Sequence, residues 1–233
     1  MNNYLFFRTD RIGDFLMSSI LLKSIKNNDP NSHITVVASN KNFFFIKKLN
    51  IVDEVIEYPS NPLKKIFFFL GLLKKKYYLT VALDGKKRSI INSILCRSNI
   101  KVLITTKEIY KKFLNSFFSL IIYSESYNSK IEEIRKILDI LHFNFDKKDL
   151  NIFSNEEDLF GEKKNLPDKF NVFHFDEKWI TGKYTNDYTQ IEPSTEELLL
   201  FLKQIVKNTD LNLVISTGIF LNPIMEELKI IFT

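Results

Sequence analysis

The chain has 233 residues, of which 45% are hydrophobic and 14% aromatic, and its 33 basic and 28 acidic residues give a net charge of +5. This length allows one large domain or two smaller ones. The mild charge argues against a nucleic-acid-binding protein, but it suits a phosphorylated substrate or an anionic membrane surface. A single cysteine, Cys96, excludes a disulfide framework within the chain. We see no signal peptide before the first apolar run and therefore expect a cytoplasmic location.

Short apolar runs alternate with helical patterns through the first part of the chain. The helix expected over 14–27 has a broad apolar arc, with Ser19, Lys23 and Lys26 on a narrow solvent side. The helix over 129–142 begins with Ser129 and Glu132, which have the spacing of a capping box. Strands are expected over 4–8, 33–38, 54–58, 79–83 and 100–104, and helices over 14–27, 42–49, 63–75, 87–96, 108–117 and 129–142.

Residues 144–169 are polar and charged, and we interpret them as a linker or crossing loop. Beyond them we expect strands over 170–174 and 211–216, a helix over 194–207 with a second capping box from Ser194 to Glu197, and a last helix near 223–228. The expected organisation is a domain over 1–145, a linker over 146–169 and a partial domain over 170–233. The last piece is too short to stand alone, so it either packs on the first domain or belongs to a longer protein.

Strands that are apolar throughout, each followed by a helix, indicate an α/β fold with parallel sheets covered on both faces. Ligands of such doubly wound sheets bind at the carboxyl ends of the strands, in loops that open helices. The corresponding loops lie at 9–13, 84–88, 174–178 and 217–218.

The loop FRTDRIGD, with a glycine just before a helix, is a natural site for an anion, because free backbone N–H groups point out of a helix N-terminus. It is neither a dinucleotide fingerprint nor a P-loop. Asp14 lies in the first helical turn, where the helix dipole stabilises a carboxylate by about 0.3–1 kcal/mol. Spacing alone therefore leaves two interpretations of Asp14 open: an acid that only suits the helix, or a reacting group. Arg8, Asp10 and Arg11 are equally explicable as a solvated loop.

Other features point to weaker alternatives. The three histidines are far apart and lack the spacing of metal ligands, so we expect no metal. Cys96 lies on an apolar helix and is expected in the core. The run IFFFLGLL at 66–73 is flanked by lysines and is too short to span a bilayer, which needs about 20 residues. It is either a helix packed on the sheet or a peripheral membrane contact.

The segment Arg8-Thr9-Asp10-Arg11-Ile12-Gly13-Asp14 resembles the N-terminal signature of glycosyltransferase family 9, the lipopolysaccharide heptosyltransferases. NIVDEVI at 50–56 and YLTVALDG at 78–85, followed by Arg88-Ser89, resemble two further segments of that family. The resemblance spans roughly residues 4–145. It implies the GT-B architecture, in which two Rossmann-like domains take the acceptor and the nucleotide-sugar donor respectively.

The resemblance also implies roles for individual residues. Asp14 matches the general base that takes a proton from the acceptor hydroxyl in an inverting transfer. Arg8, Arg11, Gly13 and Arg88 are then expected to bind acceptor anions. The implied donor is a nucleotide-diphosphate sugar, ADP-linked, with no further cofactor. The implied acceptor is lipopolysaccharide or another glycan, free or lipid-linked, reached at the cytoplasmic face of the inner membrane.

The second part of the chain fits the family less well. His174, Lys178 and Trp179 match a histidine, a lysine and a tryptophan of the donor domain, with Lys178 as the candidate for the donor phosphates, but Phe175 and Asp176 replace the family's Pro-Gly. The sequence contains no match to the family's D-[ST]-G-x-x-H-[LI]-A motif. The alternative is therefore a truncated, non-catalytic relative that binds a glycan or a partner protein.

Overall fold

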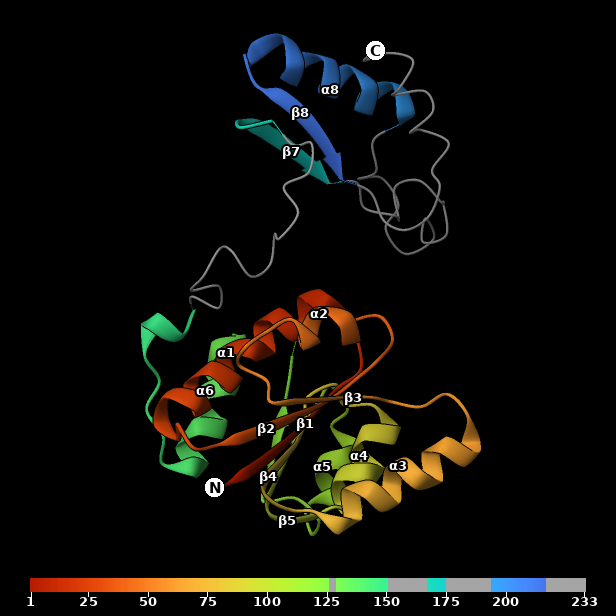
Figure 1. Cartoon of the computed structure of the whole chain (residues 1–233), viewed down its shortest axis with the longest axis vertical. Coiled ribbons are helices and arrows are strands. Elements are labelled where there is room, and N and C mark those ends of the chain that lie inside the picture. The colour runs from red at the N-terminus through yellow and green to blue at the C-terminus, as the bar shows by residue number, and fades with distance from the viewer. Residues whose placement is uncertain (126–128, 151–166, 175–193, 217–233) are drawn as a thin grey trace. The chain divides into compact units, whose positions relative to one another are not determined.

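The computed structural model describes residues 1–125, 129–150, 167–174 and 194–216. The chain divides into two compact units, Met1–Phe160 and Gly161–Thr233, and each has its own parallel sheet (Figure 1).

The first unit is built on a six-stranded parallel sheet. Its strand order is β3-β2-β1-β4-β5-β6, so the chain moves outward from β1 in one direction and then, after crossing back, in the other. The strands are β1 (Asn3–Arg8), β2 (His33–Ala38), β3 (Glu54–Glu57), β4 (Lys76–Ala82), β5 (Arg97–Thr105) and β6 (Leu120–Tyr123). The strand order is that of a doubly wound α/β sheet, as the alternation of elements predicts.

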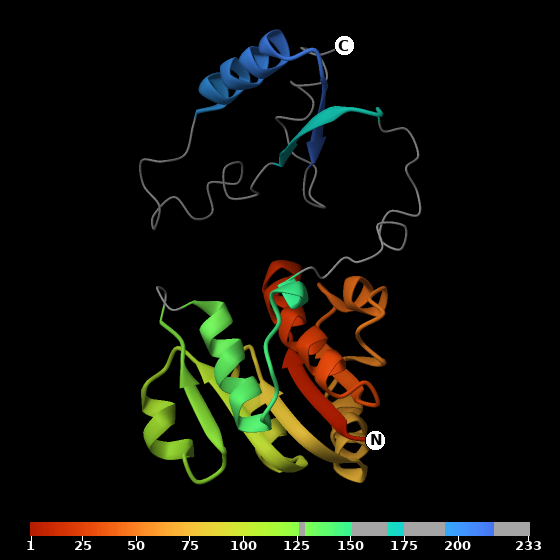
Figure 2. The same ribbon diagram turned by 90° about the vertical axis from the view of Figure 1, so that its left-hand side faces the viewer.

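Helices cover both faces of this sheet (Figures 1 and 2). Because crossovers between parallel strands are right-handed, reversing the direction of travel at β1 moves the connecting helices to the opposite face. One layer therefore holds α1, α2 and α6, and the other holds α3, α4 and α5. The helices are α1 (Ile12–Asn28), α2 (Phe43–Lys47), α3 (Pro62–Lys74), α4 (Lys87–Leu95), α5 (Ile109–Leu114) and α6 (Lys130–Leu141), followed by the 3₁₀ turn η1 (Lys147–Leu150).

The central strand β1 shows why its sequence is apolar at every position. Tyr4 and Phe6 belong to the core cluster shared with α1 and α6, whereas Leu5 and Phe7 belong to the cluster that includes Leu72 of α3. These four side chains are fully buried. Successive side chains of a strand point to opposite faces, so a strand covered on both faces has no polar side.

Three features of the first unit differ from the sequence-based expectation. β4 and β5 begin three residues earlier than predicted, because Lys76 and Arg97 pair with each other at the polar starts of these strands. β6 was not predicted at all; it is a four-residue edge strand that pairs with β5. In the expected linker, Asp149 of η1 is fully buried and accepts a hydrogen bond from Ser24 of α1 at 2.6 Å.

The expected solvent side of α1 is wrong at two positions. Ser19 is fully buried, whereas Met17, expected on the buried arc, is 43% exposed. The helix is covered by the sheet and also by α6 and η1, so its buried arc is wider than an amphipathic pattern suggests. The Ser19 hydroxyl donates to the backbone oxygen of Leu16 at 2.7 Å, which removes the cost of burying it.

The second unit pairs β7 (Phe170–His174) with β8 (Asn212–Ser216) and places α8 (Thr195–Asn208) beside them. Leu198 and Leu202 of α8 form a small buried cluster with neighbours that include Phe173. The capping box at Ser194 and Glu197 is confirmed, with both reciprocal hydrogen bonds present. The one expected at Ser129 is wrong, since that hydroxyl makes no capping bond; Lys130 instead binds Glu133 in the first turn of α6. The helix expected near 223–228 lies outside the described residues.

Candidate functional site

A pocket of about 480 Å³ opens in the first unit where β1, β2, β3 and β4 end. The pocket thus lies at the carboxyl ends of the strands, at the point where the strand order reverses. Open α/β sheets bind their ligands at this point. Of the described residues, five basic and three acidic side chains line it. The full lining is Thr9, Asp10, Arg11, Asp14, Ser39, Asn40, Lys41, Glu57, Tyr58, Pro59, Ser60, Lys65, Lys86 and Arg88.

Thr9 is fixed by the segment that follows β4. The Asp84 carboxylate accepts hydrogen bonds from the Thr9 backbone N–H at 3.1 Å, the Thr9 hydroxyl at 2.6 Å and the Ser89 hydroxyl at 2.9 Å. Lys86 donates to the Thr9 backbone oxygen at 2.8 Å. Asp84 thus ties the turn after β1 to the turn after β4.

The segment after β2 holds the same turn from its other side. Asn42 is fully buried and donates its side-chain N–H to the Arg8 backbone oxygen at 2.9 Å. The Ser39 hydroxyl bonds the Asp10 backbone oxygen at 3.2 Å, and the Ser39 N–H bonds the Asn42 side chain at 2.9 Å. The residues 8–10 are therefore held between two neighbouring loops, which makes the pocket wall a rigid element.

Arg8 does not line the pocket but pairs with two acids that do. Its guanidinium donates to the backbone oxygen of Asp14 at 2.7 and 3.1 Å and to the backbone oxygen of Leu83 at 2.8 Å. It also pairs with the Asp10 carboxylate at 3.2 Å and lies 3.8 Å from that of Asp14, and its side chain is only 12% exposed. Arg8 therefore positions the start of α1 and places a positive charge below two carboxylates.

The Asp14 carboxylate is the accessible acid of this group. Its side chain is 52% exposed and lines the pocket from the first turn of α1. The Arg8 guanidinium holds the Asp14 backbone oxygen, which fixes the point on α1 from which the carboxylate extends. An accessible carboxylate on a fixed backbone is suited to accept a proton from a bound hydroxyl.

Asp10 is the more buried acid. Its side chain is 19% exposed, one carboxylate oxygen pairs with Arg8, and the other is buried without a hydrogen-bond partner. Burial raises the pKa of Asp10, Arg8 opposes that change, and the neighbouring charge of Asp14 adds to it. The two acids therefore lie in unlike environments within one wall.

The cations of the pocket come from several loops. The Arg88 guanidinium donates to the Thr9 hydroxyl at 2.6 Å and lies 4.8 Å from the centre of the Tyr58 ring. Lys65, in the first turn of α3, lies over the same ring at 6.0 Å. Tyr58 thus lies within cation–π distance of two cations of the pocket lining.

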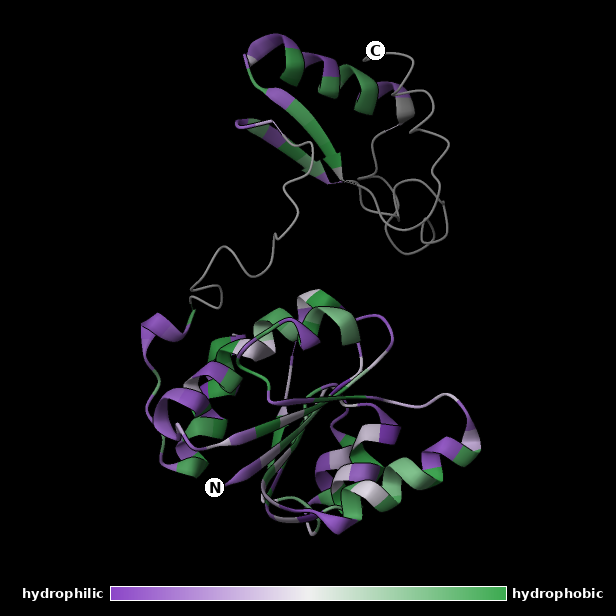
Figure 3. Ribbon diagram, viewed as in Figure 1, coloured by the Kyte–Doolittle hydropathy of each residue, from purple (hydrophilic) through white to green (hydrophobic). Residues whose placement is uncertain are grey.

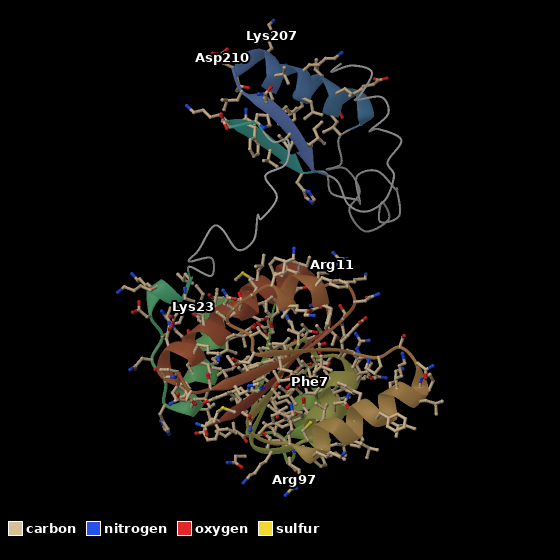
Figure 4. All side chains as sticks on the ribbon, viewed as in Figure 1. Phe7, Arg11, Lys23, Arg97, Lys207 and Asp210 are labelled. Atoms are coloured by element: carbon tan, nitrogen blue, oxygen red, sulfur yellow. The ribbon has the colours of Figure 1, made fainter. Side chains whose placement is uncertain are left out.

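Arg11 and Gly13 lie where α1 begins. Arg11 is the N-cap residue and is exposed at the surface, whereas Phe7, at the end of β1, lies inside the unit (Figure 4). A Cβ atom added to Gly13 would meet nothing within 4 Å. Glycine is therefore not needed here by the protein's own packing, and the open space lets a ligand approach the backbone closely.

The structure brings three of the expected site residues, Arg11, Asp14 and Arg88, into one pocket. Arg8 and Gly13 lie in or below the same turn but do not line the pocket, and Lys178 lies outside the described residues. The sequence-based prediction missed Lys41, Tyr58, Lys65, Lys86 and the anchoring role of Asp84. The available signal was topological: these residues follow the ends of β2, β3 and β4, or begin the next helix, at the same edge of the sheet.

Within residues 1–125, 129–150, 167–174 and 194–216, no group of three or more histidine, cysteine, aspartate or glutamate side chains is arranged to hold a metal ion. Cys96 is buried as expected, and burial raises its pKa to about 12, so its thiol stays protonated at neutral pH. In the same part of the chain, no helix has the length and apolar character needed to cross a membrane.

The structure resembles solved glycosyltransferases. The E. coli heptosyltransferase WaaC with ADP aligns over 97% of this chain and 70% of its own, with a TM-score of 0.65 and 13% identity. The same enzyme with ADP-2-deoxy-2-fluoro heptose gives a TM-score of 0.65 at 15% identity, covering 97% of this chain and 71% of the other. The glycosyltransferase of family 9 from Veillonella parvula DSM 2008 gives 0.61 at 12% identity, covering 94% and 70%.

These similarities show the fold alone: the chain shares the α/β architecture of these solved GT-B glycosyltransferases, the fold that the sequence motifs imply. The sequence matches no protein-family model and no curated protein.

Proposed function

We propose that this chain is a glycosyltransferase of the heptosyltransferase type, which moves a sugar from a nucleotide-diphosphate donor to a glycan acceptor. The observation that carries the proposal is the pocket at the carboxyl edge of the first sheet, where the accessible carboxylate of Asp14 lies among five cationic side chains. The fold shared with the heptosyltransferase WaaC supports the reaction class, and the ADP ligands of those structures support an ADP-linked donor.

The pocket is proposed to take the acceptor. Its lining carries five basic against three acidic side chains, so it favours a sugar that bears phosphate or carboxylate groups. Arg11 and Arg88 are the best candidates for these anions, because a guanidinium can donate two parallel hydrogen bonds to one anionic group. Lipopolysaccharide or a related lipid-linked glycan, met at the cytoplasmic face of the inner membrane, has this chemistry.

The proposed reaction is a single displacement. Asp14 accepts the proton of the acceptor hydroxyl while its oxygen forms a bond to the anomeric carbon of the donor sugar. The bond from that carbon to the nucleotide diphosphate breaks, and the diphosphate leaves with the bonding electrons. The anomeric configuration inverts, and no covalent intermediate with the enzyme forms. Lys178 is proposed to bind the donor phosphates.

Asp14 is preferred over the other two acids of the pocket on accessibility and position. Asp10 is mostly buried and tied to Arg8, so a sugar hydroxyl has less access to its oxygens. Glu57 ends β3, away from the first turn of α1, where the helix N-terminus favours the ionised carboxylate of Asp14. Asp14 also comes directly after Gly13, and the open space beside the Gly13 Cα lets a substrate approach.

The reaction is tested by incubating the purified chain with ADP-heptose and heptose-free lipopolysaccharide, and by following the release of ADP. We expect release that depends on the acceptor, and a product whose new glycosidic bond has the inverted configuration by NMR. Binding of the lipopolysaccharide without any release of ADP would contradict the transfer reaction and favour a non-catalytic glycan-binding relative. Release with retained configuration would contradict the single displacement.

A further inference from the structure

Helix α3 exposes a continuous apolar stripe. Leu63 is 69% exposed, Ile66 56%, Phe67 74% and Leu70 47%. These positions follow one another at steps of three, one and three residues, so they share one face of the helix. Large apolar side chains scattered singly on a surface are normal, whereas four on one helical face form a patch that marks an interaction site.

The packing of α3 on the sheet does not use this stripe. Leu72 is 2% exposed and belongs to the cluster with Leu5 and Phe7, and Phe68 packs against Tyr58 with ring centres 5.5 Å apart. These residues lie on the inner side of the helix. The expectation that 66–73 is simply a helix packed on the sheet therefore accounts for four of its seven large apolar residues and leaves Ile66, Phe67 and Leu70 unexplained.

Both ends of the stripe are strongly basic. Lys64 and Lys65 lie at its start and Lys74, Lys75 and Lys76 at its end, all of them exposed. Residues 62–76 contain no acidic side chain, although Lys75 pairs with Glu54 of β3 at 2.6 Å. Figure 3 shows α3 as hydrophobic along its middle and hydrophilic at its ends. The surface thus combines apolar and cationic chemistry.

Another helix of the same layer also exposes apolar and basic side chains. In α5, Ile109 is 58% exposed and Phe113 70%, and Lys111 and Lys112 lie on the same short helix. In the opposite layer, α2 offers a comparison: Phe44 is 75% exposed but its neighbours Phe43 and Phe45 pack against the core. Exposed apolar surface is therefore concentrated on the α3 side of the unit.

We propose that α3 binds the surface of an anionic phospholipid bilayer. The helix would lie in the plane of the interface, with Leu63, Ile66, Phe67 and Leu70 entering the boundary between headgroups and acyl chains. The lysines at both ends would reach the lipid phosphates, since their long side chains keep the charge in the headgroup region. A helix of 13 residues is too short to span a bilayer, so contact is confined to one leaflet.

This surface borders the pocket. Lys65 belongs both to the start of α3 and to the pocket lining, and it lies over the ring of Tyr58, another lining residue. Docking α3 on a bilayer therefore brings the pocket to the level of the headgroups, where a lipid-linked molecule would present its polar part. The proposal does not depend on glycosyl transfer, because membrane binding is measured without any sugar.

The test is flotation of the whole chain with vesicles made of equal parts phosphatidylglycerol and phosphatidylcholine, compared with vesicles of phosphatidylcholine alone. We expect binding to the anionic vesicles that weakens at high salt, because salt screens the lysines. The double variant Ile66→Ser/Phe67→Ser is expected to lose this binding. The matched control is Phe44→Ser, which removes an equally exposed ring from the opposite layer and should bind as the unmodified chain does.

The contribution of charge is tested separately with Lys64→Gln/Lys74→Gln. Each lysine near an anionic surface strengthens binding by about fivefold, so the pair should weaken it by about 25-fold. Lys47→Gln/Lys48→Gln, at the C-terminal end of α2, is the control with the same change in net charge. The proposal is overturned if Ile66→Ser/Phe67→Ser still binds like the unmodified chain, or if the chain binds no vesicles. It is equally overturned if the chain instead forms a dimer, by analytical ultracentrifugation, that this double variant abolishes.

Discussion

At the scale of single residues, the pocket wall holds two acids of opposite character. Asp14 is half exposed, whereas Asp10 has one carboxylate oxygen buried without a hydrogen-bond partner. A native protein retains such an oxygen where strain or function requires it. Asp10 reduces the stability of the fold in its ionised form, and this gives a direct test of its environment.

We expect Asp10→Asn to stabilise the protein at neutral pH. Burial raises the pKa of Asp10 above its value in the unfolded chain, so the folded state binds a proton more readily. Its contribution to stability is thus fully present below the unfolded pKa of about 3.9, and is lost as the pH rises through the higher folded pKa. The measurement is urea unfolding of both proteins over a series of pH values. The gap in unfolding free energy should open as the pH rises from 3.9.

A gap that closes with rising pH would show that the Arg8 ion pair outweighs burial, and that the pKa of Asp10 is lowered. Asp139→Asn, at an exposed position of α6, is the control; its gap should stay small and flat.

Gly13→Ala separates folding from function at one position. The added methyl group meets no atom of the protein, and alanine is favoured over glycine in a helix by about 0.5–1 kcal/mol. We therefore expect unchanged or higher stability by thermal unfolding, together with slower glycosyl transfer, because the methyl group narrows the open space next to Asp14, the proposed base. Unchanged transfer would remove Gly13 from the site.

The matched contrast is Gly85→Ala. Gly85 has a φ of +59°, and an added Cβ would lie 3.0 Å from the backbone oxygen of Ile104. This substitution should destabilise the fold, since both the backbone conformation and the space exclude a side chain.

At the scale of elements, the site depends on the loops that join four strands, β1 to β4, to their helices. Asp84 accepts hydrogen bonds from Thr9, Ser89 and the Lys86 backbone N–H, so it links the turns after β1 and β4. The anchoring acid is thus outside the pocket, yet it sets the position of Thr9 and Arg88 within it.

Asp84→Asn should therefore cost stability and activity together. Asparagine replaces one carboxylate oxygen by an NH₂ group, which cannot accept hydrogen bonds from the donors that meet at this position. Each donor left unpaired costs about 1–3 kcal/mol. We expect a lower midpoint of urea unfolding and a higher KM for the acceptor, because Arg88 loses its fixed partner Thr9. A variant with full stability and unchanged KM would show that the two turns are held by other contacts.

The sequence predicts buried elements better than those at the edges. β2 has the expected bounds, because its mostly apolar run is buried at every position after His33 and leaves little choice. β7 also has the expected bounds, although it is only partly buried. β6 escaped prediction because an edge strand pairs on one side only and needs few apolar residues. The capping box predicted at Ser129 does not form, although its residue spacing equals that of the capping box at Ser194. Spacing tells which groups could meet, but it does not fix the dihedral angles that bring them within hydrogen-bond distance.

The site was predictable in part for a similar reason. The first loop carries a family signature in consecutive residues, so Arg8, Arg11 and Asp14 could be named from the sequence. Lys65 and Tyr58 could not be named in this way. Tyr58 lies in the loop after β3 and Lys65 in α3, and both come close to the first loop only once the strands have taken their order in the sheet. The same limit explains why Arg8, expected to bind a ligand, does not line the pocket and instead holds the start of α1 in place.

At the scale of the whole molecule, the first unit is a complete doubly wound domain with its own core and pocket. The second unit carries two parallel strands and a capped helix over the described residues. The chain aligns over 97% of its length with the heptosyltransferase WaaC and spans 70% of that structure. The acceptor half of the proposed reaction is thus open to direct test in the first unit, whereas Lys178 and the donor half belong to the second.

The central claim is that Asp14 is the general base of a glycosyl transfer. The measurement is the rate of acceptor-dependent ADP release from ADP-heptose by Asp14→Asn, with Glu57→Gln as the control that neutralises another exposed acid of the same pocket. Arg8 holds the backbone of Asp14 and not only its side chain, so asparagine should keep the position. We predict that Asp14→Asn lowers kcat by about 10²–10⁴-fold while Glu57→Gln stays near the unmodified rate. Equal rates for the two variants would contradict the claim.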